Sequence, residues 1–145
     1  MKIREIMSSN PVCCVPGDTA QKVAKMLRDE NVGAVPVVED QQSHKLVGMI
    51  TDRDLCCSVV AGGLDPKTTS IESFISAELV TCRDGDNLEK CEKAMQEHQV
   101  RRIAIVDGDG RCIGIVSQAD LALKDKPEKV SKTVAEISKP ESSAA

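Results

Sequence analysis

The sequence is an internal tandem repeat, and this feature constrains its fold more than any other. A shift of 68 positions superposes matching residues along most of the chain: Ile3 on Ile71, Cys14 on Cys82, Gly17 on Gly85 and Val38 on Val106. Nearer the end of each copy, GMITDRDL (48–55) falls on GIVSQADL (114–121). A unit of roughly 50 residues buries too little surface to be stable alone. We therefore expect two copies that share an apolar sheet face around a pseudo-twofold axis.

Each copy predicts the same order of elements: a short helix, a brief strand, a longer helix, a hairpin and a closing helix. Asp18 and Asp86 stand in N-cap position for the longer helices, and Thr51 and Ser117 for the closing helices. The short helix, brief strand and hairpin strands are expected at 3–7, 12–15, 35–38 and 46–51 in the first copy, and at 71–75, 80–82, 103–106 and 112–117 in the second.

These elements predict an α/β fold in three parts. Residues 1–65 form the first repeat with its N-terminal helix, and residues 66–125 form the second repeat. Residues 126–145 contain a weak further echo at Val134 and Ile137, which predicts a short helix, and then the polar segment ESSAA, which we expect to be disordered. The two repeats are expected to pack through their sheets.

The chain is almost free of aromatic side chains. Only 1% of its 145 residues are aromatic, so the core must consist of aliphatic residues, methionine and cysteine. Proteins that bind single-stranded nucleic acid commonly stack bases on aromatic rings beside a basic groove. The single Phe and the net charge of -4 argue against a nucleic-acid partner. No apolar run approaches the roughly 20 residues that span a bilayer, so no membrane role is expected either.

The cysteine pattern favours a reducing compartment. Seven cysteines are an odd number, two pairs are adjacent, and the start MKIREIM is not an apolar signal segment. We therefore expect a cytoplasmic protein with mostly buried thiols. No CxxC spacing exists, so no metal site is predicted, although a thiol or metal sensor stays open as a lesser alternative through the adjacent pairs Cys13-Cys14 and Cys56-Cys57.

Sequence signatures of enzymes are missing. The chain has no phosphate-binding loop of the GxxxxGK type, no HExxH and no GxSxG, and only two histidines could supply a base near neutral pH. We therefore predict no catalytic residues and no enzymatic activity.

The repeated motifs resemble a known family. VGAVPVVED (32–40), VRRIAIVDGDG (100–110) and the twin endings of the two copies are similar to a CBS-domain pair, also called a Bateman module. GLDP (63–66) and EHQVRR (97–102) narrow the resemblance to stand-alone two-repeat bacterial proteins of the hypoxic response type. The resemblance implies two α/β repeats with two symmetry-related clefts for adenosyl ligands such as AMP, ATP, NAD or S-adenosylmethionine. It also implies a regulatory role and disk-shaped homodimers.

The resemblance assigns roles to particular residues. In one cleft Asp120 and Ser117 hold the ribose, and Arg101 or Arg102 contacts the phosphates. In the opposite cleft the corresponding ribose and phosphate residues are Thr51, Arg53 and Asp54. The adenine pocket is expected at Val12, Val32, Gly33, Ala34 and Ile115.

Two plainer interpretations of these residues remain open. Thr51 with Asp54, and Ser117 with Asp120, could serve only as helix caps. The paired arginines could simply be solvated at a strand entrance. Because Gly33 and Ala34 leave room for a base whereas Arg101 and Arg102 crowd the matching position, we expect the Asp120 cleft to be the better nucleotide site.

The predicted function is a non-catalytic sensor that needs no cofactor and binds an adenosyl nucleotide as its regulatory ligand. A homodimer and an unidentified effector protein are the expected partners. The main alternative is a ligand-free dimerisation or interaction scaffold.

Overall fold

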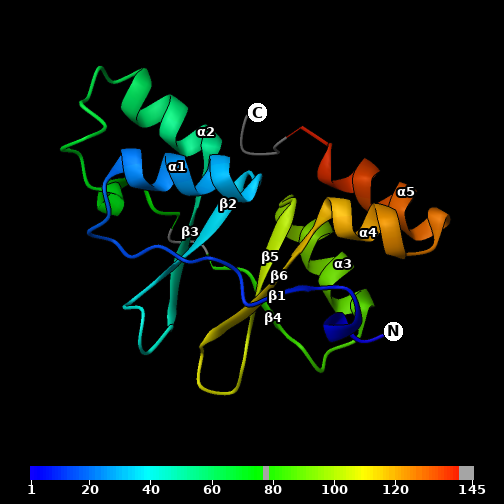
Figure 1. Ribbon diagram of the computed structural model, residues 1–145. Helices are drawn as coiled ribbons and strands as arrows, with labels where there is room; N and C mark the ends of the chain where they lie inside the picture. Colours follow the sequence, from blue (N-terminus) through cyan, green and yellow to red (C-terminus); the bar gives the residue numbers. More distant parts are fainter. Residues whose placement is uncertain (77–78, 141–145) are drawn as a thin grey trace. The chain divides into compact units, whose positions relative to one another are not determined.

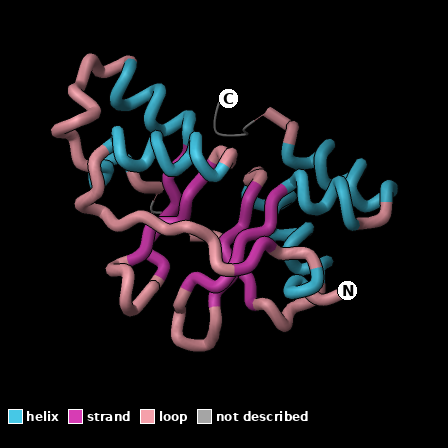
Figure 2. The backbone as a smooth tube through the Cα atoms, viewed as in Figure 1, coloured by secondary structure: helices cyan, strands magenta, loops and turns pink. Residues whose placement is uncertain are grey.

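The computed structural model describes residues 1–76 and 79–140, and the chain divides into two compact units (Figures 1 and 2). Of the described residues, unit 1 contains 1–10, 80–108 and 113–140, and unit 2 contains 11–76, 79 and 109–112. The repeats predicted from the sequence are contiguous segments. The compact units are not contiguous, because each combines most of one copy with the leading segment of the other.

Unit 1 is built on a four-stranded sheet with the strand order β1-β6-β5-β4. The strands are β1 (Ser8–Ser9), β4 (Thr81–Arg83), β5 (Arg102–Val106) and β6 (Cys112–Ser117). Strand β4 runs parallel to β5, with Cys82 opposite Ile105, whereas β1 pairs antiparallel with β6. The helices of this unit are the 3-10 turn η1 (Ile3–Glu5), α3 (Leu88–His98), α4 (Gln118–Lys124) and α5 (Pro127–Ile137).

The core of unit 1 forms where these elements meet. Leu88, Cys91 and Met95 lie on one face of α3 at helical spacing and are buried, as the sequence predicts. They pack with Ile105 from the sheet and with Ile3 from η1. Helix α5 lies against α3 and adds Ile137 to the same cluster.

Unit 2 contains the first hairpin and the helices that pack on it. Its elements are α1 (Ala20–Glu30), β2 (Ala34–Val38), β3 (Leu46–Thr51), α2 (Asp52–Leu55), the π-helical continuation η2 (Cys56–Val60) and the 3-10 turn η3 (Ile71–Phe74). Strands β2 and β3 pair antiparallel, with Val35 opposite Ile50. Gly63 follows the closing helix with a φ of 66°, a backbone conformation that glycine adopts without steric cost.

The leading segment of each copy packs in the unit that contains most of the other copy. In unit 1 the N–H of Ile3 donates to the carbonyl of Asp86, and in unit 2 the N–H of Ile71 donates to the carbonyl of Asp18. Both isoleucine side chains are fully buried, Ile3 in the core of unit 1 and Ile71 in the core of unit 2. The leading segments are therefore structural parts of these cores.

The predicted α/β fold and the hairpins are confirmed, and three local details are corrected. The strand predicted at 12–15 is reduced to a single parallel bridge between Cys14 and Val37. The N-cap positions of the longer helices lie one residue later than predicted, at Thr19, which accepts from the N–H of Lys22, and at Asn87, whose side chain makes no capping bond. Asp18 is not the cap, because its carboxylate accepts from the N–H of Val15 at 3.0 Å and pairs with Lys22.

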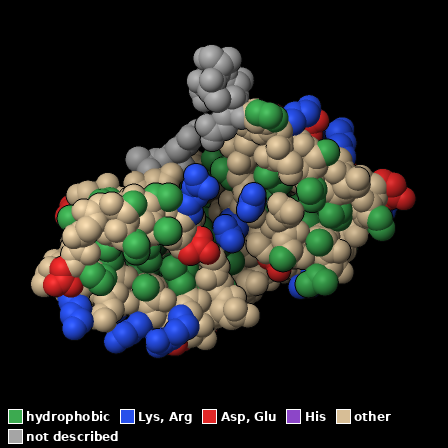
Figure 3. All heavy atoms as spheres, turned by 90° about the horizontal axis from the view of Figure 1, so that it is seen from above, with side chains coloured by type: hydrophobic (Ala, Val, Ile, Leu, Met, Phe, Trp, Pro, Cys, Tyr) green, Lys and Arg blue, Asp and Glu red, His purple; other side chains and the backbone are tan. Residues whose placement is uncertain are grey.

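The C-terminal helix predicted from the weak echo is present as α5, which spans three turns. The segment ESSAA, for which disorder is predicted, lies outside the described residues. Among the described helices, none combines the length and apolarity that crossing a membrane requires. The face drawn in Figure 3 carries basic and acidic side chains together with exposed hydrophobic ones.

Candidate functional site

Ser117 and Asp120 form a reciprocal capping box at the start of α4. The N–H of Asp120 donates to Ser117 Oγ at 3.1 Å, and the N–H of Ser117 donates to Asp120 Oδ2 at 2.8 Å. The Ser117 hydroxyl also donates to Oδ2 at 3.1 Å. On the side chains, these three bonds use only the serine hydroxyl and one carboxylate oxygen, Oδ2. The Asp120 side chain is half-buried. Within the described part of the chain, Oδ1 of Asp120 has no hydrogen-bond partner and can accept from a ligand.

Thr51 and Asp54 repeat this arrangement at the start of α2. The N–H of Asp54 donates to Thr51 Oγ1 at 3.0 Å, and the N–H of Thr51 donates to Asp54 Oδ2 at 2.9 Å. Arg53, the basic residue predicted at this site, is exposed on the first turn of α2. The capping role predicted for both pairs is therefore present, and it leaves one oxygen of each carboxylate for other contacts.

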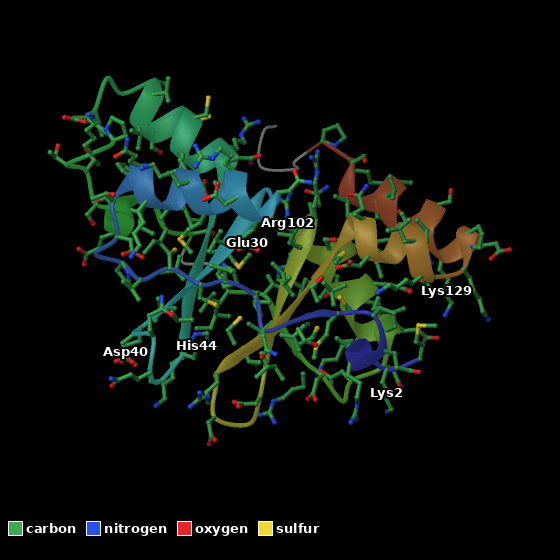
Figure 4. The ribbon with its side chains drawn as sticks, viewed as in Figure 1. Lys2, Glu30, Asp40, His44, Arg102 and Lys129 are labelled. Atoms are coloured by element: carbon green, nitrogen blue, oxygen red, sulfur yellow. The ribbon has the colours of Figure 1, made fainter. Side chains whose placement is uncertain are left out.

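A backbone hydrogen bond joins each closing helix to the entrance of its inner strand. In unit 1 the N–H of Gln118 donates to the carbonyl of Arg101 at 2.8 Å, and in unit 2 the N–H of Asp52 donates to the carbonyl of Gly33 at 3.0 Å. The first bond places Arg101 and Arg102 beside the Ser117–Asp120 capping box. Figure 4 labels Arg102 at the start of β5. Unit 1 thus brings two cations to the same point at which unit 2 has Gly33 and Ala34.

The two arginines are available for an anionic ligand. Arg101 is exposed and Arg102 is half-buried. Neither guanidinium forms an ion pair with another residue in the described ranges 1–76 and 79–140. Arginine binds phosphate oxygens through two parallel N–H bonds, so a pair at a strand entrance suits a phosphate group.

The predicted adenine-pocket residues are divided between the units. Val12, Val32, Gly33 and Ala34 belong to unit 2, and Ile115 belongs to β6 of unit 1. Val12 and Val32 are 42% and 46% exposed, so their side chains are accessible to a ligand. Ala34 is buried at the start of β2. Their joint contribution to one pocket remains a prediction.

The sequence did not single out a pair of carboxyl groups in unit 1. Glu92 on α3 is only 6% exposed, and its neighbour Asp125 follows the last residue of α4. Burial, together with the neighbouring carboxyl group of Asp125, raises the pKa of Glu92 to about 7. The sequence did contain a sign that Glu92 is buried, because this residue falls four positions after Leu88, on the apolar stripe of α3.

The cysteines form no metal centre among the described residues. All seven are reduced thiols, and Cys56 and Cys57 are exposed whereas the other five are buried. Across residues 1–76 and 79–140, no group of three or more His, Cys, Asp or Glu side chains is arranged to hold a metal ion. Burial raises the pKa of Cys14 to about 12, and this thiol is accordingly a core residue.

Comparison with known proteins gives matches over both copies. The family model for the CBS domain matches residues 3–60 and 71–125. The CBS domain-containing protein YhcV of Bacillus subtilis is 36% identical over 121 residues, which cover 83% of each chain. Hypoxic response protein 1 of Mycobacterium tuberculosis is 32% identical over 119 residues, which cover 82% of this chain and 81% of that protein.

Solved structures agree with the family match. The crystal structure of Hypoxic Response Protein I with two coordinated zinc ions has a TM-score of 0.77 at 30% identity, covering 87% of this chain and all of that one. A CBS domain protein from Pyrobaculum aerophilum, PAE2072, was solved with AMP and has a TM-score of 0.79 at 21% identity, covering 93% and 99%. The CBS domain pair of MJ0100, solved with 5′-methylthioadenosine and S-adenosyl-L-methionine, has a TM-score of 0.75 at 24% identity, covering 85% and 94%.

The last two likenesses establish the fold alone, because their identities are low. The family model and the relatives above 30% identity establish the family as well, since they match both copies in order. The capping boxes, hairpins and closing helices of the two units are the structural counterpart of these matches. The chain belongs to the CBS-domain family, with one CBS sequence in each copy of its repeat.

Proposed function

We propose that the protein is a non-catalytic regulatory module that binds an adenosyl nucleotide through the Ser117–Asp120 capping box and the Arg101–Arg102 pair. The observation that supports this most is the bond from the N–H of Gln118 to the carbonyl of Arg101, because it joins the acidic and basic groups at one site. A ribose hydroxyl and a phosphate need these two kinds of partner.

The chemistry of the ribose end follows from the hydrogen bonds already made. Oδ2 of Asp120 is occupied by the N–H and hydroxyl of Ser117, which fix the carboxylate in place. Oδ1 is left to accept from a ribose hydroxyl. A carboxylate that is held before the ligand arrives loses little freedom on binding, so it contributes more to affinity than a mobile one.

The phosphate end favours the Asp120 site over the Asp54 site. Unit 1 has Arg101 and Arg102 at the strand entrance, whereas unit 2 has Gly33 and Ala34 there. Arg53 is the basic residue nearest in sequence to Asp54, and it lies on the exposed side of α2. A nucleotide with a charged phosphate should therefore depend more on Asp120 than on Asp54.

The bound ligands of similar folds support the ligand class. PAE2072 was solved with AMP, and the MJ0100 pair with 5′-methylthioadenosine and S-adenosyl-L-methionine. All three ligands share an adenosyl group. We propose the same group for this chain, with the ribose held by Asp120 and the base contacted by aliphatic side chains, because no Tyr or Trp exists to stack on it.

Thermal shift and calorimetry test the proposal. The native protein should gain thermal stability with at least one of AMP, ADP, ATP, NAD and S-adenosylmethionine, because a ligand that binds only the native state raises its apparent stability. Asp120→Asn keeps an oxygen for the helix cap and should weaken binding at least tenfold. Asp54→Asn is the matched variant and should have a smaller effect.

Two results would overturn the proposal. If none of the five ligands shifts the transition at millimolar concentration, the scaffold alternative is favoured. If Asp54→Asn abolishes binding while Asp120→Asn leaves it unchanged, the ribose site lies in unit 2.

Regulation requires that the ligand favours one arrangement of the protein over another. We propose that the protein forms a homodimer, and that a separate effector protein recognises the arrangement that the ligand favours. The exposed apolar side chains of Leu123 on α4 and Val60 on η2, 82% and 75% accessible, are candidate contact points for such association. Sedimentation analysis with and without the ligand that shifts the thermal transition tests this step.

A further inference from the structure

The face of α3 that α5 covers contains a buried glutamate. Residues Glu89, Glu92, Gln96 and Gln99 follow one another at three- and four-residue spacing along this face. Three of them contact α5 or the residues just after it. Lys129 pairs with Glu89 at 3.1 Å, Gln96 donates to Thr133 at 3.0 Å, and Gln99 donates to the carbonyl of Lys139 at 2.9 Å. Glu92 lies between these contacts and is 6% exposed.

The carboxyl group of Asp125 acts on that of Glu92 and raises its pKa. Asp125 is the C-cap of α4, and its Oδ1 accepts from the N–H of Lys126 at 2.8 Å. Within the described residues, Oε1 of Glu92 and Oδ2 of Asp125 are buried and have no hydrogen-bond partner. If both carboxyl groups were ionised, they would repel each other and both oxygens would stay without a partner. One shared proton removes the repulsion and gives both oxygens a partner.

Charged groups of both signs surround the pair. On α5, Lys129 lowers the pKa of Glu92, but its ammonium is already paired with Glu89. Glu89 itself raises the pKa of Glu92. The remaining charged groups that line the two cavities around the pair are Met1 at the N-terminus, Lys93 on α3, Lys124 and Lys126 around the end of α4, and Lys132 on α5. Figure 4 labels Lys129 on α5.

The fold itself does not require this pair. At the matching positions of the first copy the sequence has Ala24 and Val59. Val59 is buried in the apolar core of unit 2, so an aliphatic residue suits the position of Asp125, whereas Ala24 is exposed on α1. A buried glutamate beside a half-buried aspartate is unfavourable compared with apolar residues at the same positions. The acidic pair occurs only in the copy that α5 covers, and this connects the pair with α5.

We propose that Glu92 and Asp125 hold one proton between their carboxyl groups, and that this proton keeps α5 seated on α3. When the proton is lost at higher pH, the two carboxylates repel each other and α5 opens more often. The device is independent of nucleotide binding, so its test and that of the proposed function can fail separately.

The direction of the pH effect follows from the pKa of Glu92. Burial first, and then the neighbouring carboxyl group of Asp125, raise this pKa to about 7 from the ordinary value of 4.5. Because the closed state binds the proton more tightly than the open state, protonation stabilises the closed state. This stabilisation is complete below pH 4.5 and is lost as the pH rises through 7.

Hydrogen exchange of the α5 amides in the full chain tests the proposal. Protection factors, which correct for the intrinsic rate of exchange, should fall about tenfold between pH 6 and pH 8, as linkage predicts for this change in pKa. Glu92→Gln keeps the shape and removes the titration, so its α5 protection should not change with pH. Glu97→Gln is the matched control, since Glu97 is exposed on the same helix, and it should behave like the wild type.

Flat protection in the wild type, or a pH dependence that persists in Glu92→Gln, would overturn the proposal. If Glu92→Gln fails to fold, carbon-13 titration of the wild-type carboxyl groups decides instead. A midpoint for Glu92 near neutral pH supports the shared proton. A midpoint in the ordinary glutamate range contradicts it.

Discussion

The backbone N–H of Ile3 donates a 3.0 Å hydrogen bond to the carbonyl oxygen of Asp86. Its counterpart in unit 2 joins Ile71 to Asp18 at 3.0 Å. Ile3 and Ile71 occupy the same position in the repeat, as do Asp86 and Asp18. Each bond anchors a leading segment at the entrance to the longer helix of the other copy, so the two copies complete each other's cores.

Ile3→Ala should lower the free energy of unfolding by about 2–5 kcal/mol, the usual cost of removing a fully buried isoleucine. Ile3 is fully buried against the core of unit 1. Urea denaturation measures the change. Val60→Ala is the control, since Val60 is 75% exposed and should change stability by less than about 0.5 kcal/mol. Equal effects of the two variants would show that Ile3 is not part of the core.

Gly48→Ala should destabilise the protein by about 1–3 kcal/mol, because the added methyl group has no room. A Cβ at this position would lie 2.9 Å from the carbonyl oxygen of Ser76 and would collide with the side chain of Ile75. Gly17→Ala is a matched control, since its Cβ would have no neighbour within 4 Å. Calorimetric melting should show a lower Tm for Gly48→Ala alone.

Ser117→Ala should cost about 1 kcal/mol of stability, because it removes the acceptor for the N–H of Asp120. Ser117→Thr should restore most of this loss, since Thr51 fills the same role in the first copy. Chemical denaturation monitored by circular dichroism measures both. A threonine variant as unstable as the alanine variant would contradict a capping role.

Asp86→Asn should destabilise the protein at neutral pH but not in strong acid. The N–H of Arg83 donates to the Asp86 carboxylate at 2.9 Å, and this bond, followed by Lys90, lowers the pKa of Asp86. A lowered pKa contributes stability above the usual value of 3.8 that disappears as the pH falls through the folded-state pKa.

The difference in unfolding free energy between wild type and Asp86→Asn should therefore be largest at pH 7 and should shrink below pH 4. Denaturant titrations at several pH values follow this difference. A constant difference for Asp86→Asn as well would rule out the charged hydrogen bond as its cause.

Native protein at pH 8 should react with iodoacetamide at Cys56 and Cys57, the two exposed thiols, and only slowly elsewhere. Cys14 is fully buried, and burial raises its pKa to about 12, so almost none of it is thiolate at this pH. Peptide mass spectrometry identifies the modified residues. All seven cysteines should react in denaturant, and modification of native Cys14 as fast as Cys56 would contradict the buried position.

The sequence determined the elements of this protein because their signals are local. Alternation of β-branched residues predicts the hairpin strands, and the caps Thr51 and Ser117 bond to groups three residues away. The same locality made Ser117 and Asp120 recognisable as a capping box. It also explains the error at the longer helices, where Asp18 and Thr19 are both suitable caps and only the bonds of Asp18 to Val15 and Lys22 decide between them.

Only the tertiary structure decided which partners these elements meet. Ile3 and Ile71 are isoleucines at equivalent positions of the repeat. No local signal therefore shows whether each of them packs on its own copy or on the other copy. The bond from Gln118 to Arg101 and the burial of Glu92 beneath α5 likewise join segments far apart in sequence. In a tandem repeat both pairings offer nearly equal local chemistry, and the choice between them depends on how the whole chain packs.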